Sequence, residues 1–272
     1  MLHHCRAVAR AVKSAFVVGD LPMGSYEVSP EQAIASSIRM IQEGRVQVRC
    51  PSIPSSPAPS PSPSPVPSPL SPAPAVAPSK PDSRLTDRLQ AVKFEGGVEL
   101  APTVARLTAL GIPFLGHVGL TPQRASALGG FRVQGKTLDS AQKLLADAVA
   151  VQDAGAFAVV LEAVPAEVAA LVTRELAIPT IGIGAGPATS GQVLVQVDML
   201  GYYPRGRFMP KFVKHYADMF PLAQRGVERY LADVRERQYP GPEHTYPIGE
   251  AELDAFKAFV EERARRRDGP KD

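Results

Sequence analysis

Four short apolar runs in this chain each end on one ionisable side chain. The runs AFVVGD, AVKFE, IPFLGH and FAVVLE end at Asp20, Glu95, His117 and Glu162. Their length and their lack of polar alternation are typical of strands buried on both faces of a parallel sheet. Because parallel strands place their carboxyl ends at one edge, we expect the four side chains to meet there. That edge is where α/β enzymes hold their catalytic groups.

Helical patterns separate the apolar runs and give a regular βα alternation. Helices are predicted over residues 29–43, 137–155 and 165–176. The second is capped at Thr137 and closed by Gly155, and before it Thr121-Pro122 indicates another helix start, with an N-cap and proline at the first helical position. Two more strands are predicted, over 179–184 and in the run from Val193. Six strands are therefore expected, two fewer than in a closed (β/α)8 barrel.

A Pro/Ser-rich segment interrupts this alternation. Residues 51–81 hold 13 prolines and 9 serines, so the segment has few backbone donors and little to bury, and we expect it to be extended and disordered. Removal of an insert spanning 48–90 would restore a βαβ unit of about 30 residues. A plain linker and a PxxP ligand are both compatible with the composition of this insert.

The remaining chain divides around this insert. Residues 1–47 are expected to form one part of the barrel, 91–260 its remainder with C-terminal helices, and 261–272 a solvated basic tail. Residues 1–16 contain arginines and no acids. This composition suits an amphipathic helix that leads into the first strand, and it is also found in transit peptides.

Composition argues against several classes of function. The net charge is only +3, from 30 basic and 27 acidic residues, so no nucleic-acid partner is predicted, and no apolar stretch is long enough to cross a membrane. Cys5 and Cys50 lack the number and spacing of a disulfide framework or a metal site, which fits a reducing compartment. We therefore expect a soluble enzyme that acts on small molecules.

The strand-end residues suggest metal-assisted proton chemistry. Asp20 and Glu95 offer the oxygen ligands that Mg²⁺ prefers, and Mg²⁺ needs only one or two protein carboxylates when water and substrate complete its octahedron. Taken singly, each is more commonly a capped or ion-paired loop carboxylate. Glu162 has apolar neighbours in sequence, a setting that makes a carboxylate a stronger base. Lys93, two residues before Glu95, is expected on the same face, where it can neutralise a substrate carboxylate.

Seven ordered motifs resemble the ketopantoate hydroxymethyltransferase family. They are GDLPMGSYEVSPEQA, VKFEGG, GHVGLTPQ, VQGKT, LEAVPAE, IPTIGIGAGPATSGQVLV and RFMPKFVKHYAD, and the resemblance omits residues 48–90 and about the last twenty. It implies a (β/α)8 TIM barrel of the phosphoenolpyruvate/pyruvate superfamily. It also implies transfer of a hydroxymethyl group from 5,10-methylenetetrahydrofolate to 3-methyl-2-oxobutanoate, with Mg²⁺, in pantothenate and coenzyme A synthesis.

The resemblance assigns roles residue by residue. Asp20 matches a direct metal ligand and Glu95 an acid that holds a water of the metal. Lys93 and His117 match substrate-contacting groups, and Glu162 matches the base. The family pattern also has two further βα units before this chain's Met1, and the second carries a G-D-S motif with another metal-binding Asp. We therefore expect a truncated copy, inactive and poorly folded alone, and a homo-oligomer when complete.

Two other functions remain open at this point. Another Mg²⁺-dependent C–C lyase of the same superfamily would share the barrel and the metal. A catalytically inactive fragment would instead associate with full-length subunits. The location expected from the family is mitochondrial for a eukaryotic source and otherwise cytoplasmic.

We predict that the insert is a retained intron. Val48 can be read from a GTN codon and Gln90 from CAG, so the segment can begin with GT and end with AG. Transcript sequencing across the junction should then show reads that join the codons for Gln47 and Ala91. Uniform reads through the proline-rich stretch would refute this origin.

Overall fold

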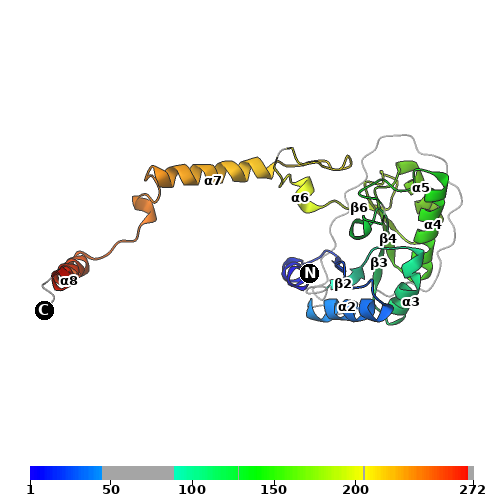
Figure 1. Ribbon diagram of the computed structural model, residues 1–272, viewed down its shortest axis with the longest axis horizontal. Coiled ribbons are helices and arrows are strands. Elements are labelled where there is room, and N and C mark those ends of the chain that lie inside the picture. Colours follow the sequence, from blue (N-terminus) through cyan, green and yellow to red (C-terminus); the bar gives the residue numbers. More distant parts are fainter. Residues whose placement is uncertain (45–88, 128, 205, 269–272) are drawn as a thin grey trace. The chain divides into compact units, whose positions relative to one another are not determined.

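The computed structural model describes residues 1–44, 89–127, 129–204 and 206–268 (Figure 1). It forms two compact units, one of Met1–Leu194 with Pro210–Val213 and one of Val195–Met209 with Lys214–Asp272. Most of the predicted insert, residues 48–88, and with it Cys50, lies outside the described residues. Its last two residues do not: Leu89 and Gln90 begin a strand, so the predicted boundary at residue 90 is wrong.

The first unit contains a six-stranded parallel sheet whose strand order follows the chain, β1-β2-β3-β4-β5-β6. Each crossover therefore steps in the same direction, and right-handed crossovers then place all the helices on one face. In a doubly wound sheet the strand order reverses, and helices therefore cover both faces. The strands are β1 (Val17–Asp20), β2 (Leu89–Lys93), β3 (Phe114–Gly119), β4 (Ala158–Glu162), β5 (Thr180–Ile183) and β6 (Gly191–Gln192).

Helices form a layer outside this sheet. Figure 1 shows α2, α3, α4 and α5 along one side of the strands, and the packing pairs α2 with β2 and α3 and α4 with β3. The helices of this unit are α1 (Leu2–Ala11), α2 (Pro30–Glu43), α3 (Ala101–Ala109), α4 (Leu138–Asp153) and α5 (Ala166–Glu175), with short 3₁₀ turns η1 (Val98–Leu100) and η2 (Pro122–Arg124). The helices predicted over 29–43, 137–155 and 165–176 thus lie within one or two residues of α2, α4 and α5, whereas α1 ends at Ala11, five residues before the end of the segment 1–16 that was expected to be helical.

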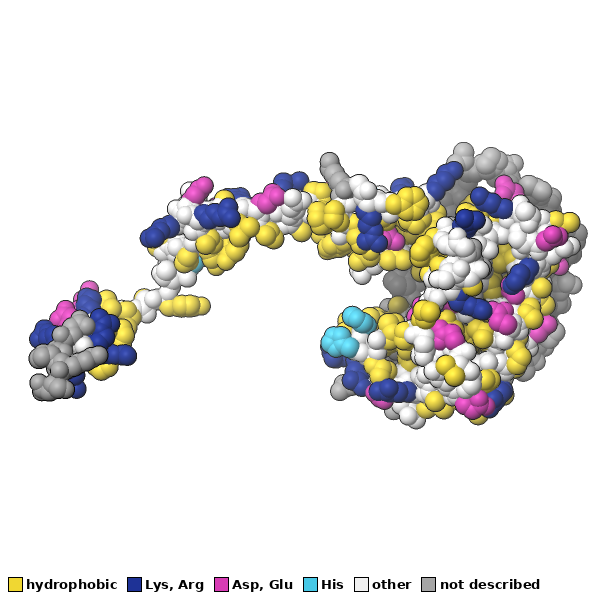
Figure 2. Space-filling view, viewed as in Figure 1, with side chains coloured by type: hydrophobic (Ala, Val, Ile, Leu, Met, Phe, Trp, Pro, Cys, Tyr) yellow, Lys and Arg dark blue, Asp and Glu magenta, His cyan; other side chains and the backbone are white. Residues whose placement is uncertain are grey.

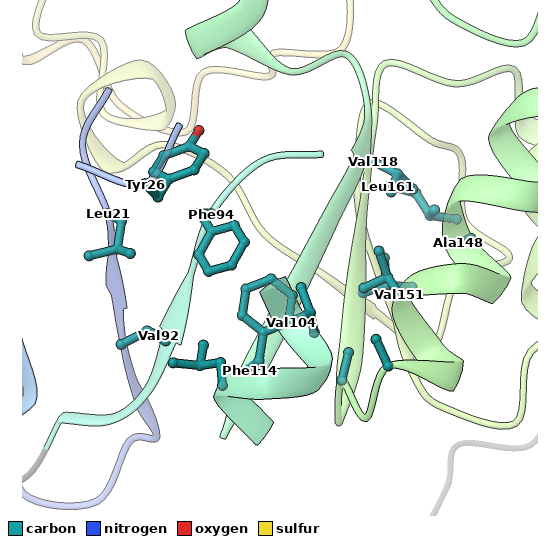
Figure 3. Packing of buried hydrophobic residues seen from close by; sticks show 14 of the residues in the cluster. Leu21, Tyr26, Val92, Phe94, Val104, Phe114, Val118, Ala148, Val151 and Leu161 are labelled. Atoms are coloured by element: carbon teal, nitrogen blue, oxygen red, sulfur yellow. The ribbon is translucent and has the colours of Figure 1, made fainter. Parts of the chain in front are cut away.

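The core lies between the sheet and these helices (Figure 3). Phe94 packs between Tyr26, at a ring-centroid distance of 5.0 Å, and Phe114, at 4.4 Å. All three rings are almost fully buried. Each buried aromatic side chain of this size contributes roughly 2–3 kcal/mol through removal of apolar surface from water. This aromatic stack fixes the segments that follow β1 and β2, which carry the candidate site.

Three strands differ from the prediction at positions that matter for the site or the sheet. β2 ends at Lys93, so Glu95 lies two residues beyond the strand that it was predicted to end. His117 lies inside β3, two residues before its end, and not at a strand terminus as expected. The sixth strand is Gly191–Gln192, whereas the apolar run from Val193 was predicted to be the strand. That run instead leads into a short helix, and Val193 and Val195 are each about half exposed. A short apolar run alone does not distinguish a strand from a helix start.

The second unit is helical. It consists of α6 (Gln196–Met199), α7 (Met219–Arg235), the 3₁₀ turn η3 (Pro242–His244) and α8 (Glu250–Asp268). Apolar side chains gather along α7 in Figure 2, among them Leu222, Val227, Tyr230 and Leu231, all exposed. The predicted basic tail is helical through residue 268 as part of α8. Among the described residues, no helix has the length and apolar character needed to span a membrane.

The start of α4 is fixed by a reciprocal capping box. Thr137 Oγ1 accepts a hydrogen bond from the Ser140 backbone N–H at 3.3 Å, and Ser140 Oγ accepts one from the Thr137 N–H at 2.9 Å. These contacts satisfy donors that the first helical turn would otherwise leave free. They matter because α4 carries Leu144, Ala148 and Val151 into the core.

We predict that Thr137→Ala lowers the free energy of unfolding by about 1 kcal/mol, because the substitution removes the capping oxygen. Thr137→Ser, which keeps that oxygen, should unfold like the unsubstituted chain. Urea denaturation followed by circular dichroism measures both. Equal losses in the two variants would show that the methyl group of Thr137, and not its hydroxyl, stabilises this turn.

Candidate active site

The register of the first four strands places their polar side chains in one row. Asp20 lies opposite Lys93 in the β1–β2 pair. Lys93 lies opposite Leu115 in the β2–β3 pair, so His117 is two residues farther along β3 and faces the same way. His117 in turn lies opposite Val160, and Glu162 is two residues farther along β4. All four side chains therefore project from one face of the sheet.

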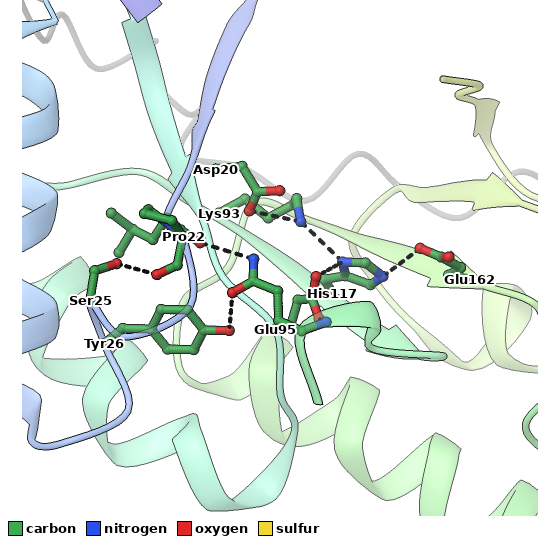
Figure 4. A network of polar contacts seen from close by, with 10 residues as sticks. Asp20, Pro22, Ser25, Tyr26, Lys93, Glu95, His117 and Glu162 are labelled. Carbon is green, nitrogen blue, oxygen red and sulfur yellow. Dashed lines mark hydrogen bonds and ion pairs between the residues drawn. The ribbon is translucent and has the colours of Figure 1, made fainter. Parts of the chain in front are cut away.

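Lys93 links two of these residues. Its Nζ lies 2.9 Å from Asp20 Oδ1 and 3.1 Å from His117 Nδ1 (Figure 4). An ammonium group can only donate hydrogen bonds, so Nδ1 of His117 is the acceptor and the ring proton resides on Nε2. The Lys93 contact thus selects the tautomer of His117.

The other ring nitrogen of His117 faces Glu162. Nε2 lies 3.1 Å from Glu162 Oε2, and both side chains are largely buried, with 5% and 13% of their surface exposed. The close approach does not make a directed hydrogen bond, and Nε2 is a buried donor without a hydrogen-bond partner among the described residues. This donor is therefore available to an oxygen atom of a bound molecule.

Glu95 is the most deeply buried carboxyl group of the row, with 4% of its side chain exposed. The backbone N–H of Gly96 donates to His117 O at 3.1 Å and turns the chain across β3. As a result Glu95 Oε1 lies 3.8 Å from His117 Nδ1, and Oε2 accepts a hydrogen bond from the Gln123 N–H at 2.9 Å. Burial raises the pKa of Glu95 above its ordinary value, although His117, the Gln123 N–H and Lys93 act in the opposite direction.

Asp20 provides the best candidate for a metal ligand. Its Oδ1 atom is buried and accepts no directed hydrogen bond within the described part of the chain, despite the nearby Lys93 ammonium. The described residues contain no cluster of three His, Cys, Asp or Glu side chains able to enclose a metal ion. A hard cation that keeps several waters, such as Mg²⁺, is compatible with so few protein donors, whereas a four-ligand zinc site is not.

The structure thus brings together all five residues that the sequence singled out, namely Asp20, Lys93, Glu95, His117 and Glu162, and their individual roles stay predictions. Two contributors were missed. Tyr26 and Gln123 hold the segments beneath the row, because the Tyr26 hydroxyl donates to Gln123 Oε1 at 3.0 Å. Both residues lie within motifs that resemble the family, and this was the only feature of the sequence that could have pointed to them.

Comparison with known proteins identifies the relationship. The sequence profile of the ketopantoate hydroxymethyltransferase family matches residues 1–50 and 79–242. The chain belongs to this family. The matched ranges include every residue of the polar row and omit residues 51–78, which hold most of the proline-rich segment.

Several curated relatives of the chain share the name 3-methyl-2-oxobutanoate hydroxymethyltransferase. The chain is 52% identical to the protein of Emericella nidulans over 262 residues, which cover 96% of the chain and 63% of that relative. The protein of Heliobacterium modesticaldum is 44% identical, with 90% of the chain and 73% of the relative covered. The chain therefore spans less than two thirds of the first relative's length.

Among solved structures, phosphonopyruvate hydrolase matches with a TM-score of 0.42 and 11% identity, covering 99% of this chain and 78% of the other.

The raised pKa of Glu95 predicts a pH-dependent stability of the metal-free chain. Below the ordinary value of about 4.5 the carboxyl group is protonated in both folded and unfolded states. As pH rises, the unfolded state releases this proton first, so stability is lost until pH exceeds the raised pKa of the folded state. Glu95→Gln stays neutral and still accepts the Gln123 hydrogen bond. In EDTA, its free energy of unfolding should therefore increase relative to the unsubstituted chain as pH rises from about 4.5 toward the raised pKa of Glu95. A constant difference across this range would contradict the burial argument.

Proposed function

We propose that this chain carries the catalytic row of a Mg²⁺-dependent 3-methyl-2-oxobutanoate hydroxymethyltransferase. The observation that carries the proposal is the continuous row from Asp20 through Lys93 and His117 to Glu162, with Glu95 buried beside it. The family relationship and the shared name of the relatives support the same reaction. In it, a hydroxymethyl group passes from 5,10-methylenetetrahydrofolate to the oxo acid and gives ketopantoate.

Asp20 would hold the metal directly and Glu95 would hold it through water. Oδ1 of Asp20 is buried and accepts no directed hydrogen bond in the described residues, and it lies 2.9 Å from the Lys93 ammonium, which a bound cation would replace as its partner. It therefore fits a direct ligand, and the buried carboxyl group of Glu95 fits an acceptor for a coordinated water. Mg²⁺ bound there would supply positive charge that stabilises negative charge developing on the oxo acid.

The remaining residues would bind and deprotonate the substrate. Lys93 lies between Asp20 and His117 and would neutralise the substrate carboxylate. His117 Nε2–H would donate to a substrate oxygen, since it has no directed partner in the described chain. Glu162, at the end of β4 and 13% exposed, would accept the proton from C3 of 3-methyl-2-oxobutanoate. The resulting carbanion equivalent would then attack the one-carbon unit.

We further propose that the fold is a (β/α)8 barrel, of which six strands lie in the described residues. Consecutive strand order and a helix layer on one side support this geometry. The two-residue steps from Lys93 to His117 and from His117 to Glu162 agree with it, because closed barrels need a stagger between neighbouring strands, although Asp20 and Lys93 lie directly opposite each other. The row then faces the barrel interior at the carboxyl ends of the strands.

A product assay tests the reaction itself. The purified chain is incubated with 3-methyl-2-oxobutanoate, 5,10-methylenetetrahydrofolate and Mg²⁺, and ketopantoate is measured by mass spectrometry. Ketopantoate formed by the chain supports the proposal. If the chain alone is inactive, mixing it with the intact Emericella nidulans relative and testing for co-assembly separates an associating fragment from a different lyase.

We predict that Glu162→Gln reduces exchange of the C3 proton of the oxo acid at least about 100-fold, because the amide cannot accept the proton. Mg²⁺-dependent binding of the oxo acid should be largely unchanged. NMR in D₂O follows the exchange, and calorimetry follows the binding. Glu175→Gln is the matched control, because Glu175 is an exposed residue at the end of α5. Exchange at the unsubstituted rate in Glu162→Gln would assign the base to another residue.

A further inference from the structure

We propose that Gln123 is a positioning residue that holds the loops after β1 and β2 together and so sets the spacing between Asp20 and Glu95. This inference rests on the proposed function for the metal role of the two carboxylates. The loop contacts that support it do not depend on the metal. Gln123 lies in η2, after β3, and is half-buried.

Gln123 makes three hydrogen bonds to two neighbouring loops. Its side-chain Nε2 donates to the backbone carbonyl of Leu21 at 3.0 Å, and its Oε1 accepts from the Tyr26 hydroxyl at 3.0 Å. Its backbone N–H donates to Glu95 Oε2 at 2.9 Å. One residue therefore contacts both the carbonyl of Leu21, the residue that follows Asp20, and the carboxyl group of Glu95.

Tyr26 fixes the orientation of the Gln123 amide. Its hydroxyl must meet an acceptor, because the side chain is 2% exposed and its pKa is raised by burial, which keeps the phenol protonated. The amide oxygen consequently points to Tyr26 and the amide nitrogen to Leu21. The Tyr26 ring stacks on Phe94, the residue directly before Glu95. Packing and hydrogen bonding thus couple the same two loops.

Leu21 leaves little freedom for the neighbouring Asp20. Its N–H donates to Lys93 O at 2.8 Å and its carbonyl accepts from Gln123, so both peptide units that flank the residue are held. Loss of the Gln123 amide would release one of these two restraints. The backbone N–H of residue 123 would remain, but the segment that carries it would no longer be tied to the first loop.

Gln32 provides a matched control. Its Nε2 donates to Gly24 O at 2.9 Å, and its Oε1 accepts from the Val28 N–H at 3.0 Å. It therefore anchors the same loop after β1 through two amide hydrogen bonds, but its side-chain amide has no hydrogen bond to Glu95 or Leu21 in the described structure. Methionine at either position keeps the length of the side chain and removes the amide.

Hydrogen exchange of the metal-free chain tests the coupling. Gln123→Met should raise amide exchange about fivefold in both segments 21–28 and 94–97, the effect of losing about 1 kcal/mol of local stability. Gln32→Met should raise exchange in 21–28 alone. Unchanged exchange in 94–97 of Gln123→Met, or equal changes in both variants, would overturn the proposed link between the loops.

Binding of Mn²⁺, used as a spectroscopic substitute for Mg²⁺, tests the consequence for the carboxylates. Electron paramagnetic resonance should show a dissociation constant raised about tenfold in Gln123→Met, in the range found when groups that orient metal ligands are removed. Gln32→Met should bind like the unsubstituted chain. Unaltered affinity in Gln123→Met would overturn the positioning role even if exchange is faster. Failure of the unsubstituted chain to bind Mn²⁺ would overturn the proposed metal site, and with it the effect of Gln123 on metal binding. In that case the hydrogen-exchange experiment alone would decide whether Gln123 couples the two loops.

Discussion

The stagger between neighbouring parallel strands is the constraint on which the candidate site depends. Lys93 pairs with Leu115 and His117 with Val160, and in each case the next functional residue lies two positions farther along. A step of two preserves the face of the sheet, whereas a step of one would turn the side chain toward the helix layer. Backbone pairing, and not attraction between the charges, therefore decides which residues meet.

Burial then gives these residues their chemical character. Glu95 and His117 each expose about one twentieth of their side chain, and both depend on backbone groups or neighbours for their polar contacts. The support comes from loops that follow three different strands, with Tyr26, Gly96 and Gln123 as the main contributors. Such a site has little tolerance for altered loop geometry, because an ionised group that loses a partner in a buried setting is destabilised.

The sequence allowed much of this arrangement to be predicted, for reasons that are physical. Asp20 and Glu162 end buried parallel strands, and the common edge of a parallel sheet brings such termini together. The position of His117 inside β3 was not predictable from the end of its apolar run, since Val118 continues the buried strand. The false strand at Val193 has a different origin, because Val193 and Val195 are each about half exposed, so the apolar run there indicates neither burial nor a strand.

Loop contacts account for most of the remainder. Gln123 follows a Thr-Pro pair that indicated a helix start, yet the structure gives a 3₁₀ turn without a side-chain cap at Thr121. No periodicity predicts that a glutamine in such a turn reaches a carbonyl 102 residues earlier in the chain. Contacts of this kind depend on the completed sheet, which brings the loops after β1, β2 and β3 side by side.

The balance of charge in the row has a consequence for the order in which ligands bind. Lys93 is the one ammonium group in a row that also holds Asp20, Glu95 and Glu162. Even with Glu95 protonated, the carboxylates of Asp20 and Glu162 outnumber it, so the row is negative overall. Two like charges 4 Å apart repel by about 4 kcal/mol at the effective dielectric of a protein surface. On the proposed function, an anionic oxo acid would meet this repulsion until a cation had bound, which favours an ordered addition with the metal first and the oxo acid second.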